Sequence, residues 1–308
     1  MVRQCSLSRL VAAKLSSLRR TKAYRNFGDI WRPILPHLPL DVRFIAFNQR
    51  GYDGSSPSLE GSGMPKRQMT EEYATGFALF IDHIVHTLGL PSTSDGGGII
   101  LLAWSKGSVL TTALLSRMLD PTQPPLPSPI HTHLAAVLLF EPPSSLLARR
   151  TPDLDSALGP PGSTPAEAAS SFLGWCASNP LSDEQAALAR AAFEPRNITH
   201  GFEWGLAAET AARTLRDAAV PIGLLVGTAT RGYFVDAAGA IARAWSGAPN
   251  ARVRVGLEGA DHVAMVAMPE RFARAVVSVS ETVAPGKLSQ DGVKQCRKRK
   301  YNSPYAAF

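Results

Sequence analysis

The feature that most constrains the fold is a series of short apolar runs separated by segments with helical periodicity. Between the runs, Glu71–Leu88, Ser108–Leu119 and Arg271–Thr282 repeat apolar residues at the spacing of one helix face. The runs are rich in Ile, Val and Leu, as expected of strands covered by helices on both faces. Alternating strands and helices predict an α/β fold with a mostly parallel sheet flanked by helices. The runs are Val42–Phe47, Ile99–Trp104, Ala136–Phe140, Ile222–Val226 and Arg252–Leu257.

The segment 144–218 interrupts this alternation because it contains no run typical of a strand. It is rich in alanine and has helical spacing over Pro165–Cys176, Ser182–Phe193 and Glu203–Arg216. We interpret it as a helical cap inserted over one end of the sheet. The α/β domain then spans residues 29–285, and the polar, basic, aperiodic segment 286–308 is predicted to be a disordered tail.

Residues 1–28 form a basic segment ahead of the domain, with seven Lys or Arg residues and no acidic residue. Its apolar residues follow helical spacing, which predicts a basic amphipathic helix. A Ser-rich, acid-free segment of this kind is also typical of an organelle transit peptide. We expect a cytoplasmic protein and keep mitochondrial targeting as the alternative. The residues in the helical pattern are Leu7, Leu10, Val11, Leu15 and Leu18.

Charge and composition argue against several classes of protein. The net charge of +7 is concentrated at the ends of the chain, including Arg297–Lys300, whereas a nucleic-acid binder carries a basic stripe on its folded domain. We therefore expect no nucleic-acid partner. Apolar runs are too short for a membrane span, and three scattered cysteines predict neither a disulfide framework nor a metal site. No cofactor motif is present, and nothing in the sequence indicates the oligomeric state.

The strand Ile99–Trp104 runs directly into Ser105, and Gly107 follows two residues later. The stretch from Ala103 to Gly107 reads A-W-S-K-G, which is a nucleophile-elbow pattern with Ala in place of the first Gly. Such a turn raises the serine above the carboxyl edge of the sheet, beside the N–H groups of a helix N-terminus. Ser105 is therefore the candidate nucleophile, and the backbone N–H of Lys106 is the candidate oxyanion donor.

Over roughly residues 27–282, the chain resembles the α/β-hydrolase superfamily, closest to its capped, fungal-type and dehalogenase-like members. The stretch FIAFNQRGYDGSS (Phe44–Ser56) is similar to the family's D-x-R-G-x-G-x-S strand and loop, with Asn48 in place of Asp. The preceding stretch, GDIWRPILPHLP, is similar to the family's first helix. LEGADHVAMVAMPERFARAV (Leu257–Val276) resembles the stretch that carries the catalytic histidine.

The resemblance implies that His262 is the base and that an acid lies between Ser105 and His262 in the sequence. The usual acid position, after the Ile222–Val226 strand, holds Thr230, which cannot serve. Glu141 ends the preceding strand, where the dehalogenase-like subset can place its acid, and we favour it over the alternative, Asp236. Asp261, next to His262, is expected to point away.

These residues predict a serine hydrolase acting on a carboxylic ester, lactone or thioester, with a small apolar ester-like substrate. A serine nucleophile argues against a dehalogenase or an epoxide hydrolase, in which the family uses Asp. Aromatic residues of the cap are candidates for an apolar pocket lining, although such residues more often pack helices together. They are Phe172, Trp175, Phe193 and Trp204.

The sequence shows no pattern for the family's early strands or for the His-Gly loop that supplies a second oxyanion donor in the family. That loop is expected about nine residues before Trp31, where Thr21–Tyr24 stands. Without the third family strand, the Val42 strand must pair directly with the Ile99 strand, or the sheet stays open and prone to aggregation. The alternative function is therefore a catalytically inactive binding protein or a truncated gene product, and we expect marginal stability.

Overall fold

The computed structural model describes most of the predicted domain and one short segment ahead of it. The described residues are 9–12, 27–40, 42–48, 50–52, 55–59, 62–147, 157, 160, 163–192, 206–248, 250 and 252–285. The predicted tail 286–308 lies outside them, as do Phe193 and Trp204.

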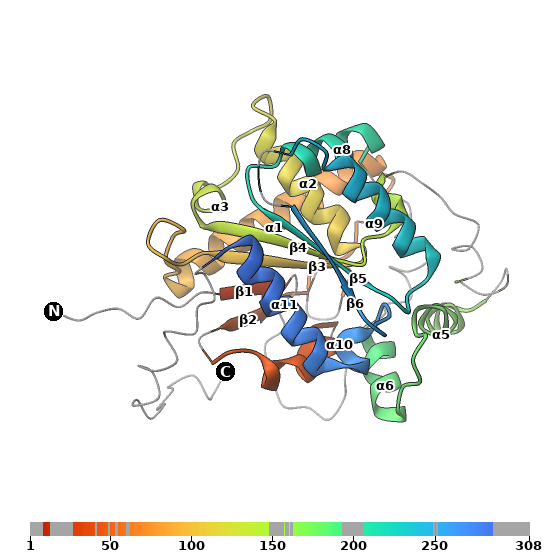
Figure 1. The fold of residues 1–308 in the computed structure, drawn as a ribbon. Coiled ribbons are helices and arrows are strands. Elements are labelled where there is room, and N and C mark those ends of the chain that lie inside the picture. The colour runs from red at the N-terminus through yellow and green to blue at the C-terminus, as the bar shows by residue number, and fades with distance from the viewer. Residues whose placement is uncertain are drawn as a thin grey trace.

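The core of the molecule is a six-stranded sheet in the order β2-β1-β3-β4-β5-β6, and all of its neighbouring strands are parallel (Figure 1). The prediction of a mostly parallel α/β sheet is confirmed. The strands are β1 (Arg9–Ala12), β2 (Arg43–Ala46), β3 (Ile99–Trp104), β4 (Leu134–Phe140), β5 (Ile222–Gly227) and β6 (Arg252–Leu257).

Strand β1 corrects the prediction for the N-terminal segment, because Arg9–Ala12 is a strand and not part of a basic amphipathic helix. It lies between β2 and β3, with Val11 opposite both Ile45 and Leu101. The prediction that the Val42 strand pairs directly with the Ile99 strand, or leaves the sheet open, is wrong. A short apolar run fits helix and strand patterns equally well, and pairing on both sides outweighs so weak a local preference.

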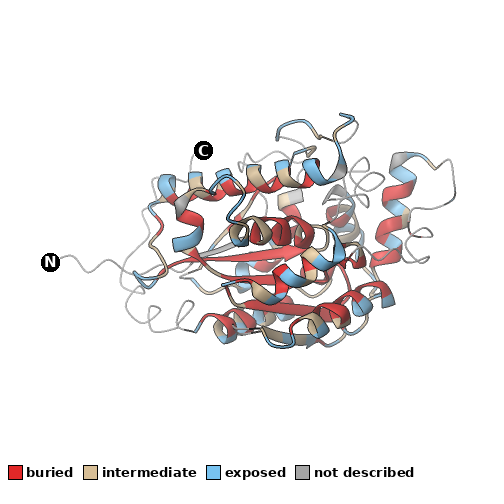
Figure 2. Ribbon diagram, turned by 90° about the horizontal axis from the view of Figure 1, so that it is seen from above, coloured by how far each residue is buried: buried red, intermediate tan, exposed pale blue. Residues whose placement is uncertain are grey.

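Helices cover both faces of the sheet, as predicted, and the sheet lies buried between them (Figure 2). Alternate residues of β3 point to opposite faces: Ile99, Leu101 and Ala103 join one core cluster, and Ile100, Leu102 and Trp104 join the other. Helices α1 (Lys66–Leu88), α2 (Gly107–Leu119), α8 (Ala208–Asp217) and α9 (Gly232–Ala244) cover the first face, with α3 (Ser128–His133) beside α1. The 3-10 helix η1 (Phe27–His37) and α11 (Pro269–Val283) cover the second.

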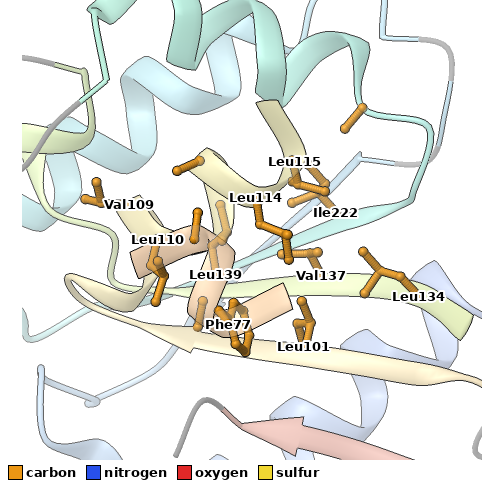
Figure 3. Packing of buried hydrophobic residues seen from close by; sticks show 14 of the residues in the cluster. Phe77, Leu101, Val109, Leu110, Leu114, Leu115, Leu134, Val137, Leu139 and Ile222 are labelled. Atoms are coloured by element: carbon orange, nitrogen blue, oxygen red, sulfur yellow. The ribbon is translucent and has the colours of Figure 1, made fainter. Parts of the chain in front are cut away.

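The core between the sheet and α2 shows why β3 leads into a buried helix. Leu110 and Leu114 of α2 lie over Leu139 and Val137 of β4, and Phe77 of α1 lies close to the sheet (Figure 3). All residues of α2 from Ser108 to Leu115 are buried. The turn between β3 and α2 is therefore fixed at both ends by packed elements.

The segment predicted as a cap divides into two parts. Helices α5 (Pro165–Cys176) and α6 (Asp183–Ala192) contact each other, and α6 also contacts η1 and the short helix α10 (Ala264–Ala267). The 3-10 helix η2 (Ser144–Leu147) and α8 instead contact α2 and α9. Helix α8 therefore belongs to the helical layer of the sheet, and the cap that we propose consists of α5 and α6.

Among the helices in the described part of the chain, none combines the length and the apolar character that a membrane-spanning helix needs.

Candidate active site

Ser105 and Glu141 occupy equivalent places at the carboxyl ends of neighbouring strands. Ser105 follows β3 and donates its backbone N–H to Phe140 O at 2.9 Å, whereas Glu141 follows β4 and donates its own to Leu225 O at 3.1 Å. They are the only non-glycine residues with a positive φ among the described residues, with values of 52° for Ser105 and 48° for Glu141. Strain of this kind costs about 1–3 kcal/mol and is concentrated at functional sites.

The His262 imidazole is held by the Glu141 carboxylate. Nδ1 of His262 lies 2.8 Å from Oε2 of Glu141, and both side chains are fully buried. Because a carboxylate only accepts hydrogen bonds, Nδ1 carries the proton in this bond, and in the neutral imidazole Nε2 then presents its lone pair. Nε2 is buried and has no hydrogen-bond partner among the described residues, Ser105 included. Catalytic hydrogen bonds are often long in unliganded enzymes and tighten with substrate.

The Glu141 carboxylate accepts from two further donors, one at the end of β5 and one shortly after it. Gly227 donates its N–H to Oε1 at 2.9 Å, and Thr230 donates its hydroxyl to Oε2 at 2.8 Å. A side chain at Gly227 has no room, because its Cβ would lie 2.1 Å from the carbonyl oxygen of Ala260. Thr230, which cannot itself be the acid, helps to orient the Glu141 carboxylate.

Two aromatic rings confine the His262 ring. Phe234 of α9 stacks on it, with 4.0 Å between the ring centroids and an interplanar angle of 15°. Trp104, the residue before Ser105, has its ring centroid 5.1 Å from that of His262. Together with the Nδ1 hydrogen bond, these contacts leave the ring little freedom to turn. Phe234 was not among the predicted site residues, because no local pattern shows which α9 residue faces the histidine.

The other candidate residues lie in different environments. Asp236 is an exposed residue of α9, and neither ring nitrogen of His262 bonds to it. Lys106 lies directly before α2, so its N–H is at the helix N-terminus beside Ser105. Phe172 and Trp175 are buried in the core, where Trp175 packs 5.6 Å from Phe234 between ring centroids. Residues 13–26, which follow β1, lie outside the described residues.

In the part of the chain that the structure describes, no group of His, Cys, Asp and Glu residues is arranged to hold a metal ion.

Cys176 provides a prediction about the surroundings of this site. It is fully buried, and burial, together with the nearby Glu141 and Asp261 carboxylates, raises the pKa of its thiol well above the usual range. Alkylating reagents react with the thiolate. We expect iodoacetamide to leave Cys176 unmodified in the native protein at neutral pH and to modify it in denaturant, as followed by peptide mass spectrometry. Rapid modification of the native protein would contradict this expectation.

Residues 24–275 match the sequence profile described as "Alpha/beta hydrolase family". Among curated proteins, none matches the sequence. Solved structures with the same fold include a lipase-esterase related protein from Clostridium acetobutylicum (12% identity, TM-score 0.60, covering 89% of this chain and 95% of that one). The esterase RhEst1 from Rhodococcus sp. has 17% identity and a TM-score of 0.61, covering 91% and 92%. Naproxen esterase from Bacillus subtilis has 18% identity and a TM-score of 0.57, covering 88% and 82%.

Proposed function

We propose that this chain, which belongs to the alpha/beta hydrolase family, is a serine hydrolase that uses Ser105, His262 and Glu141. The observation that carries the proposal is the buried His262–Glu141 pair, joined at 2.8 Å, in which the second ring nitrogen has no hydrogen-bond partner within the described part of the chain. The strained Ser105 lies next to Trp104, which contacts the same imidazole. A nucleophile, a base and an orienting acid are the parts that acyl transfer requires.

In the proposed first half-reaction, Ser105 Oγ attacks the carbonyl carbon of the substrate while Nε2 of His262 takes the hydroxyl proton. The positive charge that develops on the imidazole is stabilised by Glu141 through Nδ1–H. The tetrahedral intermediate then collapses to an acyl-serine, and His262 returns the proton to the leaving alcohol or thiol. A water molecule attacks the acyl-serine in the second half-reaction, with the same proton transfers, and releases the acid.

The negative charge on the substrate oxygen needs donors near Ser105. We assign one of them to the backbone N–H of Lys106, since it belongs to the residue after the nucleophile and lies at the N-terminus of α2. In the family, the second donor normally lies in the loop after the third strand, and β1 takes the place of that strand between β2 and β3. The sequence after β1 has no glycine from Ala13 to Phe27, so a His-Gly loop does not supply the second donor.

The proposed substrate is a small ester, lactone or thioester with an apolar acyl group. Solved structures with this fold support this class, because they include esterases, a lipase-esterase related protein and a thioesterase domain. Every step proposed above uses only side chains, backbone N–H groups and water, so we propose no cofactor. Localisation, cytoplasmic or mitochondrial, stays a prediction from the sequence.

Labelling with a fluorophosphonate probe tests the proposal, because such probes react with activated serines. We expect the full chain to be labelled and to hydrolyse p-nitrophenyl esters of short acids. Ser105→Ala should abolish labelling, and His262→Ala should abolish both labelling and hydrolysis, with circular dichroism showing that each variant is folded. A folded wild-type protein that neither labels nor hydrolyses any of these esters would contradict the proposal and favour the inactive binding protein.

A further inference from the structure

Asp261 is a fully buried carboxylate next to His262 in the sequence, yet it does not contact the imidazole. Its Oδ2 accepts the backbone N–H groups of Ser178 and Asn179, at 2.9 and 2.8 Å, and Nδ2 of Asn179 at 3.0 Å. Its Oδ1 accepts the backbone N–H of Val263 at 3.1 Å. Ser178 and Asn179 lie in the connection between α5 and α6. One carboxylate therefore binds the connection of the two cap helices to the turn that carries His262.

Two neighbouring hydrogen bonds extend the same attachment to both sides of that turn. Asn179 also donates Nδ2 to the carbonyl oxygen of Gly259 at 2.8 Å, ahead of His262. Gln185 of α6 donates Nε2 to the carbonyl oxygen of Val266 at 2.9 Å, beyond it. The segment around His262 therefore contacts the cap at three places, namely at Gly259, at Asp261 and at Val266.

The attachment is strong because Asp261 is buried. A buried carboxylate is costly unless donors satisfy it, and hydrogen bonds to a charged acceptor are about twice as strong as neutral ones. Separating the α5–α6 connection from the turn would leave the Asp261 carboxylate without three of its donors in a fully buried place. The connection and the turn are therefore expected to move as one unit.

We propose that Asp261 is a positioning residue that couples the placement of the α5–α6 connection to the position of the His262 imidazole. The inference rests on the proposed role of His262 as the base. Misplacement of a catalytic group by about 1 Å can cost about 100-fold in rate. A substrate that displaces the α5–α6 connection would therefore move the His262 imidazole. With the connection in its observed place, Nε2 is held in position to take the proton from Ser105.

The variant Asn179→Ala tests the coupling in the full chain. It removes the side-chain donor to Asp261 and Gly259 but leaves the backbone donors, so the protein should fold. Ser178→Ala is the matched control, because the bond from Ser178 to Asp261 comes from its backbone N–H. We expect Asn179→Ala to lower kcat for ester hydrolysis about 10-fold with little change in KM, since base placement affects the reaction more than binding. Ser178→Ala should stay within about twofold of the wild type.

Asp261→Asn should have a larger effect. Both oxygens of Asp261 accept N–H groups, and the NH₂ group of asparagine would face N–H donors in place of one of these oxygens. We expect a loss of kcat of about 100-fold together with a lower melting temperature. Should this variant fail to fold, Asn179→Ala still decides the matter.

A spectroscopic measurement separates this inference from the proposed function. The Nδ1 proton of His262 should give a low-field proton resonance, which we expect to shift or broaden in Asn179→Ala and to stay unchanged in Ser178→Ala. A response of this resonance in a chain without esterase activity would overturn the proposed function and retain the coupling. A folded Asn179→Ala protein with wild-type kcat and an unchanged resonance would overturn the coupling.

Discussion

Replacing Glu141 by glutamine is expected to lower kcat for ester hydrolysis by about 10⁴-fold while the protein stays folded. In serine proteases, the matching change from carboxylate to amide has about this effect, because it selects the wrong tautomer of the histidine. The size and shape of the side chain are retained, so the core around the site should change little. The measurement is steady-state hydrolysis of a p-nitrophenyl ester, with circular dichroism as the check on folding.

The reason lies in the donors that surround the carboxylate. Gly227 N–H, Thr230 hydroxyl and His262 Nδ1 all point at Glu141, and a carboxylate can accept from each of them. A glutamine that accepts from the Gly227 N–H turns its NH₂ group toward Thr230 and His262. Nδ1 must then be the acceptor, so the ring proton moves to Nε2. In that tautomer, Nε2 cannot take the proton from Ser105.

Asp236→Asn is the matched control, since it makes the same chemical change at the alternative acid. Asp236 is exposed on α9, and we expect its amide variant to keep kcat within about twofold. The reverse pattern, with Glu141→Gln nearly active and Asp236→Asn inactive, would move the role of the acid to Asp236.

The strands that are buried on both faces could be predicted from the sequence. Their short, continuous runs of apolar residues are typical of such strands. Ile99–Trp104 is apolar throughout, is buried throughout and is a strand over the predicted bounds. The turn after it could also be anticipated, since Ser105 and Gly107 follow a strand and precede a helical pattern. In contrast, Arg9–Ala12 is too short for periodicity to decide between helix and strand.

The surroundings of His262 could be predicted only in part. Its position after the last strand was visible in the motif, whereas its contacts with Phe234 and Thr230 depend on how separate elements meet. Thr230 does occupy the place where related proteins usually hold the acid, and this proximity was a usable signal for a hydrogen-bond partner. The extent of the cap was also uncertain, because a pattern of helices does not show that α8 packs against α2.

The position of β1 changes what is expected of the N-terminal segment. A helix at Met1–Leu18 would contribute no partner to the sheet, so its removal would leave the strand pairing intact. A strand at Arg9–Ala12 instead pairs with β2 on one side and β3 on the other. Its removal would leave both neighbours with unpaired N–H and C=O groups in the middle of the sheet. The open edge on which we based the expectation of marginal stability is thus filled.

Deletion of residues 1–12 is therefore expected to abolish cooperative unfolding and to shift the protein into the insoluble fraction, because unpaired strand edges promote aggregation. Deletion of residues 1–8 is the matched control, since it retains β1, and the shortened protein should unfold cooperatively like the full chain.

Within the full chain, Val11→Pro removes one N–H from the paired strand. The carbonyl group that loses its donor costs about 1–3 kcal/mol if it is buried, and the proline ring adds a steric clash. Val11→Ala keeps that N–H and should cost less. Urea unfolding followed by circular dichroism measures all four, and a soluble, cooperatively folded chain without residues 1–12 would show that β1 is not required.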